Sequence, residues 1–218
     1  MNTSQSTSTD RYQRLYDRMA PFYATGMRLL PVWQRYTETV LPWLDKLQVS
    51  GPVLEIGPGP GVLLTKLSQR FDVAVGLDLS TGMLVEAQGR LRGAGLPARL
   101  VQGNAVQLPF ASGSCAAVTL TFAFSAFPKG LAAMQEIARV LCSGGLVVLV
   151  DAAEPDDRNA AGMALAKTWE MFGDFMRDEA DLMQQAGLEI VECYNFGAFH
   201  SIRLTVGRRV ATPRTSPR

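Results

Sequence analysis

The sequence predicts one α/β domain, built on a mostly parallel sheet with helices on both faces. Apolar runs of four to six residues alternate with longer amphipathic stretches, the pattern of strands and helices in turn. The expected strands are apolar along their whole length, as strands covered on both sides should be. A glycine-rich segment follows the first of them directly. Together these features are typical of a doubly wound fold.

Five strands and three helices are expected in the central part of the chain. The strands are Val53–Ile56, Val73–Asp78, Arg99–Gln102, Ala116–Thr121 and Leu146–Asp151. The helices are Val62–Gln69, Thr81–Arg92 and Leu131–Leu141. Ser80 is placed to cap the second helix, and the pair Gly144-Gly145 is placed to stop the third.

The C-terminal part predicts two more strands, Leu188–Tyr194 and Phe199–Val206. The link between them, Asn195–Ala198, is so short that the two strands must pair antiparallel. Alternation then puts the only histidine, His200, on one face with apolar neighbours. This favours a structural histidine over a catalytic one. The neighbours on that face are Ala198, Ile202, Leu204 and Val206.

We expect a single domain over residues 10–207. Its parts are a helical cover at 10–50, a core that binds the cofactor at 51–152, an insertion at 153–187 and a C-terminal hairpin at 188–207. Residues 1–9 and 208–218 are poor in apolar side chains and are expected to be disordered tails. Within the cover, helices are expected to break at Pro21, Pro31 and Pro42.

Composition excludes several classes of function. The chain has 218 residues, and 21 Lys and Arg balance 20 Asp and Glu, so it has no overall positive field for a nucleic acid. The three cysteines lack the short spacing of a metal or redox motif, which predicts reduced, mostly buried thiols and no metal site. They are Cys115, Cys142 and Cys193. Without a long apolar window or a signal-peptide pattern at residues 1–9, a cytoplasmic protein is expected.

The strongest motif is the glycine loop after the first expected strand, which reads Glu55-Ile56-Gly57-Pro58-Gly59-Pro60-Gly61. Glycine lets a backbone turn tightly and approach a ligand closely. The dinucleotide pattern G-x-G-x-x-G would need glycine at position 62, where this chain has Val62. Pro58 and Pro60 also lack the N–H groups that bind a diphosphate. The loop therefore favours a ligand without phosphate and counts against an NAD-dependent oxidoreductase.

Asp78 ends the second expected strand, about twenty residues beyond the loop. At that position a carboxylate faces the crevice beside the loop, and its two oxygens can accept both hydroxyls of a ribose. The alternative is that Asp78 only caps the helix that starts near Thr81. Because it follows the glycine loop at this distance, we expect the ribose role.

In order and spacing, these residues resemble the class I S-adenosylmethionine-dependent methyltransferases, in particular their ubiquinone/menaquinone-biosynthesis-like group. The resemblance spans residues 16–206 and is carried by the loop, by Asp78 and by four further segments. These are Ser80–Leu84, Gly103–Ala105 with Leu108–Phe110, Glu136–Leu141 and Gly144-Gly145. It implies a Rossmann-like sheet of seven strands in the order 3-2-1-4-5-7-6, with strand 7 antiparallel.

The resemblance also implies S-adenosyl-L-methionine as cofactor and a set of residues that bind it. Glu55 would organise the loop, and the three loop glycines would lie under the methionine and ribose. Asn104 stands where the family commonly has Asp, and its carbonyl oxygen would accept from the adenine amino group. The full set is Glu55, Gly57, Gly59, Gly61, Asp78, Leu79, Met83, Asn104, Ala105 and Thr121.

The segment after the fourth strand lies where the family places the methyl acceptor. It carries Phe122, Phe124 and Phe127, which favour an apolar or aromatic acceptor pocket, and no residue that could be named as a general base. The resemblance adds Tyr16 and Tyr23 as residues that could close over the site. The implied reaction is methyl transfer to a small, partly apolar acceptor, with the rate gained from proximity and orientation.

Two alternatives stay open. A basic, aromatic N-terminal stretch with five arginines could rest on anionic lipid, which would suit N-methylation of a phospholipid head group. The missing base would suit a protein that binds S-adenosylmethionine without catalysis. An acidic group, Asp174, Arg177, Asp178, Glu179 and Asp181, could bind an amine acceptor or could be a solvated face.

Overall fold

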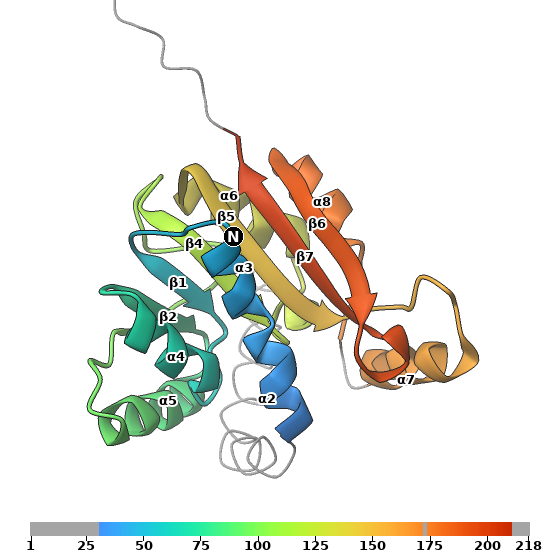
Figure 1. Ribbon diagram of the computed structural model, residues 1–218, viewed down its shortest axis with the longest axis horizontal. Helices are drawn as coiled ribbons and strands as arrows, with labels where there is room; N and C mark the ends of the chain where they lie inside the picture. The colour runs from blue at the N-terminus through green and yellow to red at the C-terminus, as the bar shows by residue number, and fades with distance from the viewer. Residues whose placement is uncertain (1–30, 172–173, 211–218) are drawn as a thin grey trace, which may run out of the picture.

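The computed structural model describes residues 31–171 and 174–210, and it contains a seven-stranded sheet in the order β3-β2-β1-β4-β5-β7-β6 (Figure 1). β7 runs antiparallel to both of its neighbours, and the other pairs are parallel. The expected fold and strand order are confirmed. The strands are β1 Val53–Ile56, β2 Ala74–Asp78, β3 Leu100–Gln102, β4 Cys115–Thr121, β5 Leu141–Ala152, β6 Leu188–Phe196 and β7 Ile202–Arg209.

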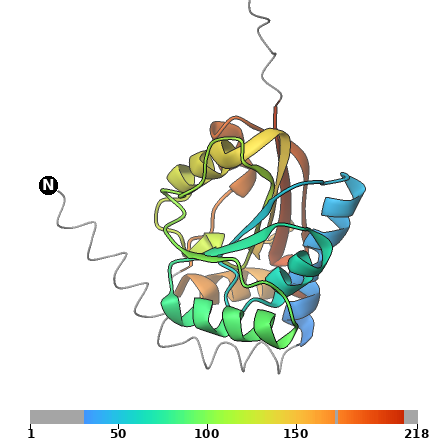
Figure 2. The same cartoon turned by 90° about the vertical axis from the view of Figure 1, so that its left-hand side faces the viewer.

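Helices cover both faces of this sheet. Figures 1 and 2 show α2, α3 and α4 on one side and α6 on the other. Each side has its own apolar core, one centred on Leu64 and Val148 and the other on Ile137 and Leu149. The helices are α2 Pro31–Glu38, α3 Val40–Lys46, α4 Val62–Arg70, α5 Thr81–Gly93, α6 Gly130–Val140, α7 Ala160–Met171 and α8 Glu179–Gln185. Two short 3₁₀ turns are η1 Phe124–Ala126 and η2 Ala198–His200.

The parallel register brings the functional segments to one edge of the sheet. Ile56 pairs with Leu77, and Glu55 pairs with Thr119, so β1, β2 and β4 end side by side. The turns that leave these strands therefore meet, as expected at the carboxyl edge of a doubly wound sheet. The glycine loop, Asp78 and the β4 exit, which is the segment of residues 122–128 that follows β4, share this edge.

Local corrections follow from tertiary packing. Gly144-Gly145 does not stop α6, which ends at Val140; the pair instead lies in a bulge near the start of β5. At Gly145 an added Cβ would lie 2.9 Å from the Cys142 carbonyl oxygen, so this bulge needs glycine. Pro42 does not break a helix either. It lies in the first turn of α3, where the N–H that proline lacks would have no partner in the helix.

The C-terminal hairpin also differs from expectation. β7 begins at Ile202, so His200 lies in the η2 turn, where it is exposed and faces Asp157 at 3.3 Å. Its predicted place on the apolar strand face is wrong. β7 then continues to Arg209, which donates to the carbonyl oxygens of Arg139 and Leu141, so the expected tail starts too early.

Two other expectations concern the chain as a whole. Cys115 is buried, but Cys193 is exposed, so the prediction of mostly buried thiols fails for Cys193. In residues 31–171 and 174–210, no helix has the length and apolar character needed to cross a membrane.

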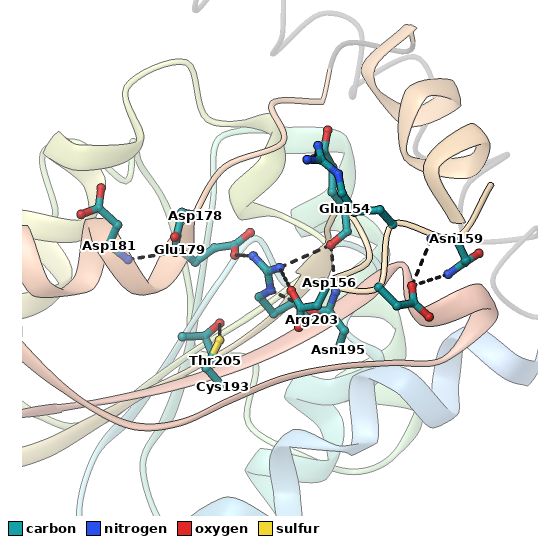
Figure 3. Close-up of polar contacts among 12 residues, drawn as sticks. Glu154, Asp156, Asn159, Asp178, Glu179, Asp181, Cys193, Asn195, Arg203 and Thr205 are labelled. Carbon is teal, nitrogen blue, oxygen red and sulfur yellow. Dashed lines mark hydrogen bonds and ion pairs between the residues drawn. The ribbon is translucent and has the colours of Figure 1, made fainter. Parts of the chain in front are cut away.

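Arg203 of β7 joins the C-terminal hairpin to the segments that follow β5 (Figure 3). Its guanidinium donates to Asn195 Oδ1 at 2.7 Å and to Asp156 Oδ1 at 2.8 Å, and it lies 3.6 Å from Glu179 Oε2. The Glu179 side chain is only 3% exposed. Burial, and then the nearby Asp151, raise the pKa of Glu179 to about 7 despite Arg203. Glu179 is therefore not part of the solvated face that we considered for the acidic segment.

We expect Arg203→Ala to destabilise the protein by about 3–5 kcal/mol at pH 8, because Glu179 would then be a buried charge without a counter-ion. The loss should be smaller at pH 6, where Glu179 takes up a proton. Chemical denaturation at the two pH values measures this difference. Adding Glu179→Gln to Arg203→Ala should remove most of the pH dependence of this stability loss. An equal loss of stability at both pH values would contradict the role of Arg203 as the counter-ion of Glu179.

Candidate functional site

Glycine is required at two positions of the loop between β1 and α4. Gly57 has φ +70°, and an added Cβ would lie 2.6 Å from the Ala123 Cβ, so a side chain here would push the loop off the β4 exit. Gly61 has φ +78°, and an added Cβ would lie 3.0 Å from the backbone of Ala87 on α5. Gly61 therefore acts through helix packing, and it lines neither of the cavities described below.

The Asp78 carboxylate faces this loop. Its Oδ2 accepts from the Gly59 N–H at 3.3 Å, and its Oδ1 accepts from the Ser80 N–H at 3.0 Å. The N-cap of α5 is Ser80 itself, whose hydroxyl accepts from the Met83 N–H at 3.1 Å. Asp78 is therefore not the side chain that caps α5, and its carboxylate is turned toward the crevice.

A cavity of about 140 Å³ opens between the glycine loop, the end of β2 and the β4 exit. Most of its wall is apolar, and among the described residues that line it Asp78 is the only charged one. It brings together seven of the predicted cofactor residues: Gly57, Gly59, Asp78, Leu79, Met83, Asn104 and Ala105. Asn104 Oδ1 already accepts from the Val106 N–H at 3.1 Å, which closes a local turn in the cavity wall.

A second, smaller cavity of about 30 Å³ lies on the other side of the loop. Glu55, Thr121 and Phe122 line it together with Thr37 of α2 and the loop itself. Glu55 is buried, and its Oε2 atom has no hydrogen-bond partner. Desolvation, and then the charge of Asp78, raise the Glu55 pKa from 4.5 to about 8.

The role of Glu55 in organising the loop stays a prediction, since only its Oε2 atom is known to lack a hydrogen bond. The loop is joined to its surroundings by Asp78, by the Arg90 Nε, which donates to the Pro60 carbonyl oxygen at 2.9 Å, and by the Gly57 N–H, which donates to Leu77 O at 2.8 Å.

The three phenylalanines of the β4 exit were expected to line one acceptor pocket, but their side chains lie in three different places. Phe122, with φ +51°, lines the small cavity, and its ring centroid lies 6.5 Å from that of Tyr36. Phe127 lines the large cavity. Phe124 is 1% exposed and packs in the apolar core, so it cannot contact an acceptor there, and we withdraw it from the acceptor set.

Asp151, at the end of β5, holds this exit in place, although nothing in the sequence singled it out. Its carboxylate accepts from the Ser125 N–H at 2.9 Å, the Ser125 hydroxyl at 2.8 Å and the Ala152 N–H at 2.8 Å. The Ser125 carbonyl oxygen accepts from the Phe175 N–H, which fastens the segment before α8 to the same turn. A single Asp at the end of an apolar strand is the only sequence signal that could have found it.

The predicted acidic group does not form one site. Asp178 caps α8 by accepting from the Asp181 N–H, and the Arg177 guanidinium lies over the Phe175 ring at 4.5 Å. Asp174 and Arg177 lie near the β4 exit. Arg177 donates to the Pro128 carbonyl oxygen at 3.4 Å, and burial together with Asp151 raises the pKa of Asp174 to about 6. Tyr16 and Tyr23, like four of the five N-terminal arginines, lie outside the described residues.

Comparison with known proteins agrees with this geometry. The family described as "Methyltransferase domain" matches residues 54–149, from β1 into β5. A demethylmenaquinone methyltransferase from Thermus thermophilus is 34% identical over 148 residues, which cover 65% of this chain and 66% of the relative. A ubiquinone/menaquinone biosynthesis C-methyltransferase from Syntrophotalea carbinolica is 30% identical, and the match covers 68% of this chain and 64% of the relative. The chain thus spans just under two thirds of these relatives.

Solved structures share the fold. One is a geranyl diphosphate C-methyltransferase from Streptomyces coelicolor, solved with S-adenosyl-L-homocysteine. Its TM-score is 0.64 at 16% identity, and the match covers 77% of this chain and 73% of that enzyme's chain. The [4+2]-cyclase SpnF has a TM-score of 0.67 at 15% identity, covering 82% and 81%. Since a cyclase shares this fold, the fold alone does not determine the reaction.

We expect Glu55→Gln to be more stable than the wild type at pH 8, by about 3–5 kcal/mol, and nearly equal to it at pH 5. The folded protein keeps the Glu55 proton up to about pH 8, whereas the unfolded chain loses it near pH 4.5. Stability is therefore lost as the pH rises between these values. Urea denaturation of both proteins from pH 5 to 8 tests this, and parallel pH curves would contradict it.

Proposed function

We propose that this chain, which contains a class I S-adenosylmethionine-dependent methyltransferase domain, transfers a methyl group from S-adenosylmethionine to a small, partly apolar acceptor. One observation carries the choice of donor. The glycine loop is flanked by two carboxyl groups, Asp78 and Glu55, and no Lys, Arg or His is among the described residues that line either cavity. The Asp78 carboxylate repels a phosphate, and this lining suits a nucleoside with a positively charged tail.

The residues present fit the nucleoside part of S-adenosylmethionine. Asp78 would accept the ribose hydroxyls, and the walls beside Leu79, Met83 and Ala105 would take the adenine ring. A Cβ at Gly57 would close the approach to Ala123, so the loop can lie against a ligand only as glycine. When bound, S-adenosylmethionine supplies a methyl group that is already activated on a sulfonium. The protein then needs mainly to position the acceptor and exclude water.

Aromatic residues support an acceptor with a flat ring. The Tyr36 ring lies between Phe122 and Phe196, with centroid distances of 6.5 and 5.6 Å. Phe122 also lines the small cavity beside the loop. Side chains of this kind bind planar apolar groups by stacking and edge contacts. Together with the names of the relatives in Thermus and Syntrophotalea, they favour a quinol-type ring as the acceptor.

Asp78→Ala should weaken binding of S-adenosylhomocysteine at least about tenfold, because two hydrogen bonds to a carboxylate are lost. Isothermal calorimetry measures this. The affinity of Asp78→Asn, which keeps one acceptor oxygen, should lie between the affinities of Asp78→Ala and the wild type. Asp72→Ala, an exposed carboxylate a few residues earlier, is the control and should bind normally. Equal affinity in all four proteins would overturn the ribose role.

The acceptor is tested with labelled S-adenosylmethionine. We expect label in a reduced naphthoquinone and none in phosphatidylethanolamine vesicles or in simple amines. Label in the vesicles would favour the head-group alternative instead. Binding of S-adenosylhomocysteine with no label in any acceptor would keep the cofactor site and overturn the proposed transfer.

A further inference from the structure

Residues 103–113, here called the wall segment, join β3 to β4 without a helix or strand of their own. Their first part, residues 103–106, nevertheless forms part of the wall of the large cavity. One turn of the segment is closed locally, because Asn104 Oδ1 accepts from the Val106 N–H and the Asn104 carbonyl oxygen accepts from the Gln107 N–H at 3.0 Å. The backbone groups that follow this turn need partners from elsewhere in the molecule.

Two side chains of α6, Glu136 and Arg139, supply those partners. Glu136 Oε2 accepts from the Leu108 N–H at 2.7 Å. The Arg139 guanidinium donates to the carbonyl oxygens of Leu108 at 3.0 Å and Phe110 at 2.8 Å. The Arg139 carbonyl oxygen in turn accepts from the Gly113 N–H at 3.0 Å. We call Glu136 and Arg139 the α6 clamp, since together they hold the wall segment from residue 108 to residue 113.

The two side chains of the α6 clamp also hold each other. Arg139 donates from Nε to Glu136 Oε1 at 2.7 Å and from a terminal nitrogen to Glu136 Oε2 at 2.8 Å. A two-bond contact of this kind is stronger and more specific in geometry than a single hydrogen bond. The hydrogen bond from Arg139 lowers the pKa of Glu136 below its usual value, so the pair stays charged at neutral pH. The clamp therefore presents a fixed array of donors and acceptors to the wall segment.

The helix that carries the clamp also adjoins a second part of the cavity wall. α6 begins at Gly130, directly after Phe127 and Pro128, which line the large cavity. Leu108 of the wall segment and Ile137 of α6 belong to the same apolar core. The position of α6 thus fixes two parts of the wall relative to each other, one through the clamp and one through the chain itself.

We propose that Glu136 and Arg139 are positioning residues, which set the affinity and the base selectivity of the large cavity through the backbone that they hold. Neither is among the described residues that line this cavity, so they act through the wall segment and not by touching a ligand. This rests on the proposed function, in which the adenine of S-adenosylmethionine lies against this wall. A wall held in one conformation binds without the cost of ordering it, and it distinguishes a base that fits from one that does not.

The first test is binding of S-adenosylhomocysteine, measured by isothermal calorimetry at pH 7. Arg139→Lys keeps the charge but cannot make the two-bond contact and reach both carbonyl oxygens, so we expect about five- to tenfold weaker binding. Arg70→Lys is the matched control. Arg70 of α4 makes the same two-bond contact with Asp45 of α3, and neither residue is among the described residues that line either cavity. Arg70→Lys should bind as the wild type does.

Base selectivity separates positioning from a merely structural role. S-inosylhomocysteine lacks the amino group of adenine, which the resemblance predicts to be bound by Asn104. We expect the wild type to prefer S-adenosylhomocysteine, and this preference should fall severalfold in Arg139→Lys but not in Arg70→Lys. A structural role alone would weaken both ligands equally. Equal affinity of the wild type for the two ligands, or an unchanged preference in Arg139→Lys, would overturn the proposal.

Hydrogen exchange of the Leu108 N–H reports directly on the clamp. In Glu136→Ala this amide should exchange faster, and affinity for S-adenosylhomocysteine should fall with it. Glu136→Gln keeps an acceptor oxygen and should restore part of both properties. Faster exchange at Leu108 with unchanged affinity would show that the wall segment is held for stability only.

The outcomes distinguish the two proposals. If the wild type binds S-adenosylhomocysteine and the variants at Glu136 and Arg139 bind it equally well, the positioning role is wrong and the proposed function stands. If the wild type does not bind S-adenosylhomocysteine, the proposed function is wrong, and the positioning role with it.

Discussion

The close contact between the glycine loop and the β4 exit is the constraint on which the site depends. At Gly57 there is no room for a Cβ beside Ala123, and the same turn carries the Gly59 N–H that Asp78 accepts. The ends of three strands, β1, β2 and β4, are thereby held against one another. Both cavities are the space that remains around this contact, so moving the loop would alter both.

Of three buried carboxyl groups near this edge, two are stabilised by neighbouring groups, each in a different way. Asp151 accepts hydrogen bonds from Ser125 and Ala152, and in doing so it holds the β4 exit. Glu179 lies next to a guanidinium that also binds two neighbouring segments (Figure 3). Glu55 has neither kind of partner. Burial of a charged carboxylate is costly, and the partners of Asp151 and Glu179 lower that cost, whereas Glu55 avoids it by keeping its proton through neutral pH.

Much of the fold and of the larger cavity could be predicted from the order of the residues. The apolar strands, the loop glycines and Asp78 carry signals that are local in sequence, and Leu79, Met83, Asn104 and Ala105 were added by resemblance. The predictions that failed concern positions where packing against distant segments decides the structure. Phe124 looks like its neighbours Phe122 and Phe127, but the backbone turn of η1 directs it into the core. Gly144-Gly145 looks like a helix stop, but α6 ends earlier and the pair fits a bulge against Ala116.

By itself, the sequence determined the fold class, the strand order through resemblance, and the loop and carboxylate that define the larger cavity. These follow from periodicity, glycine spacing and strand ends, which act over a few residues. Only the tertiary structure decided that Thr37 of α2 lies beside Glu55, that Asp151 holds Ser125 and that Arg203 meets Glu179. These pairs are 18 to 26 residues apart, and no local pattern encodes them, because burial and charge compensation depend on which segments fold against each other.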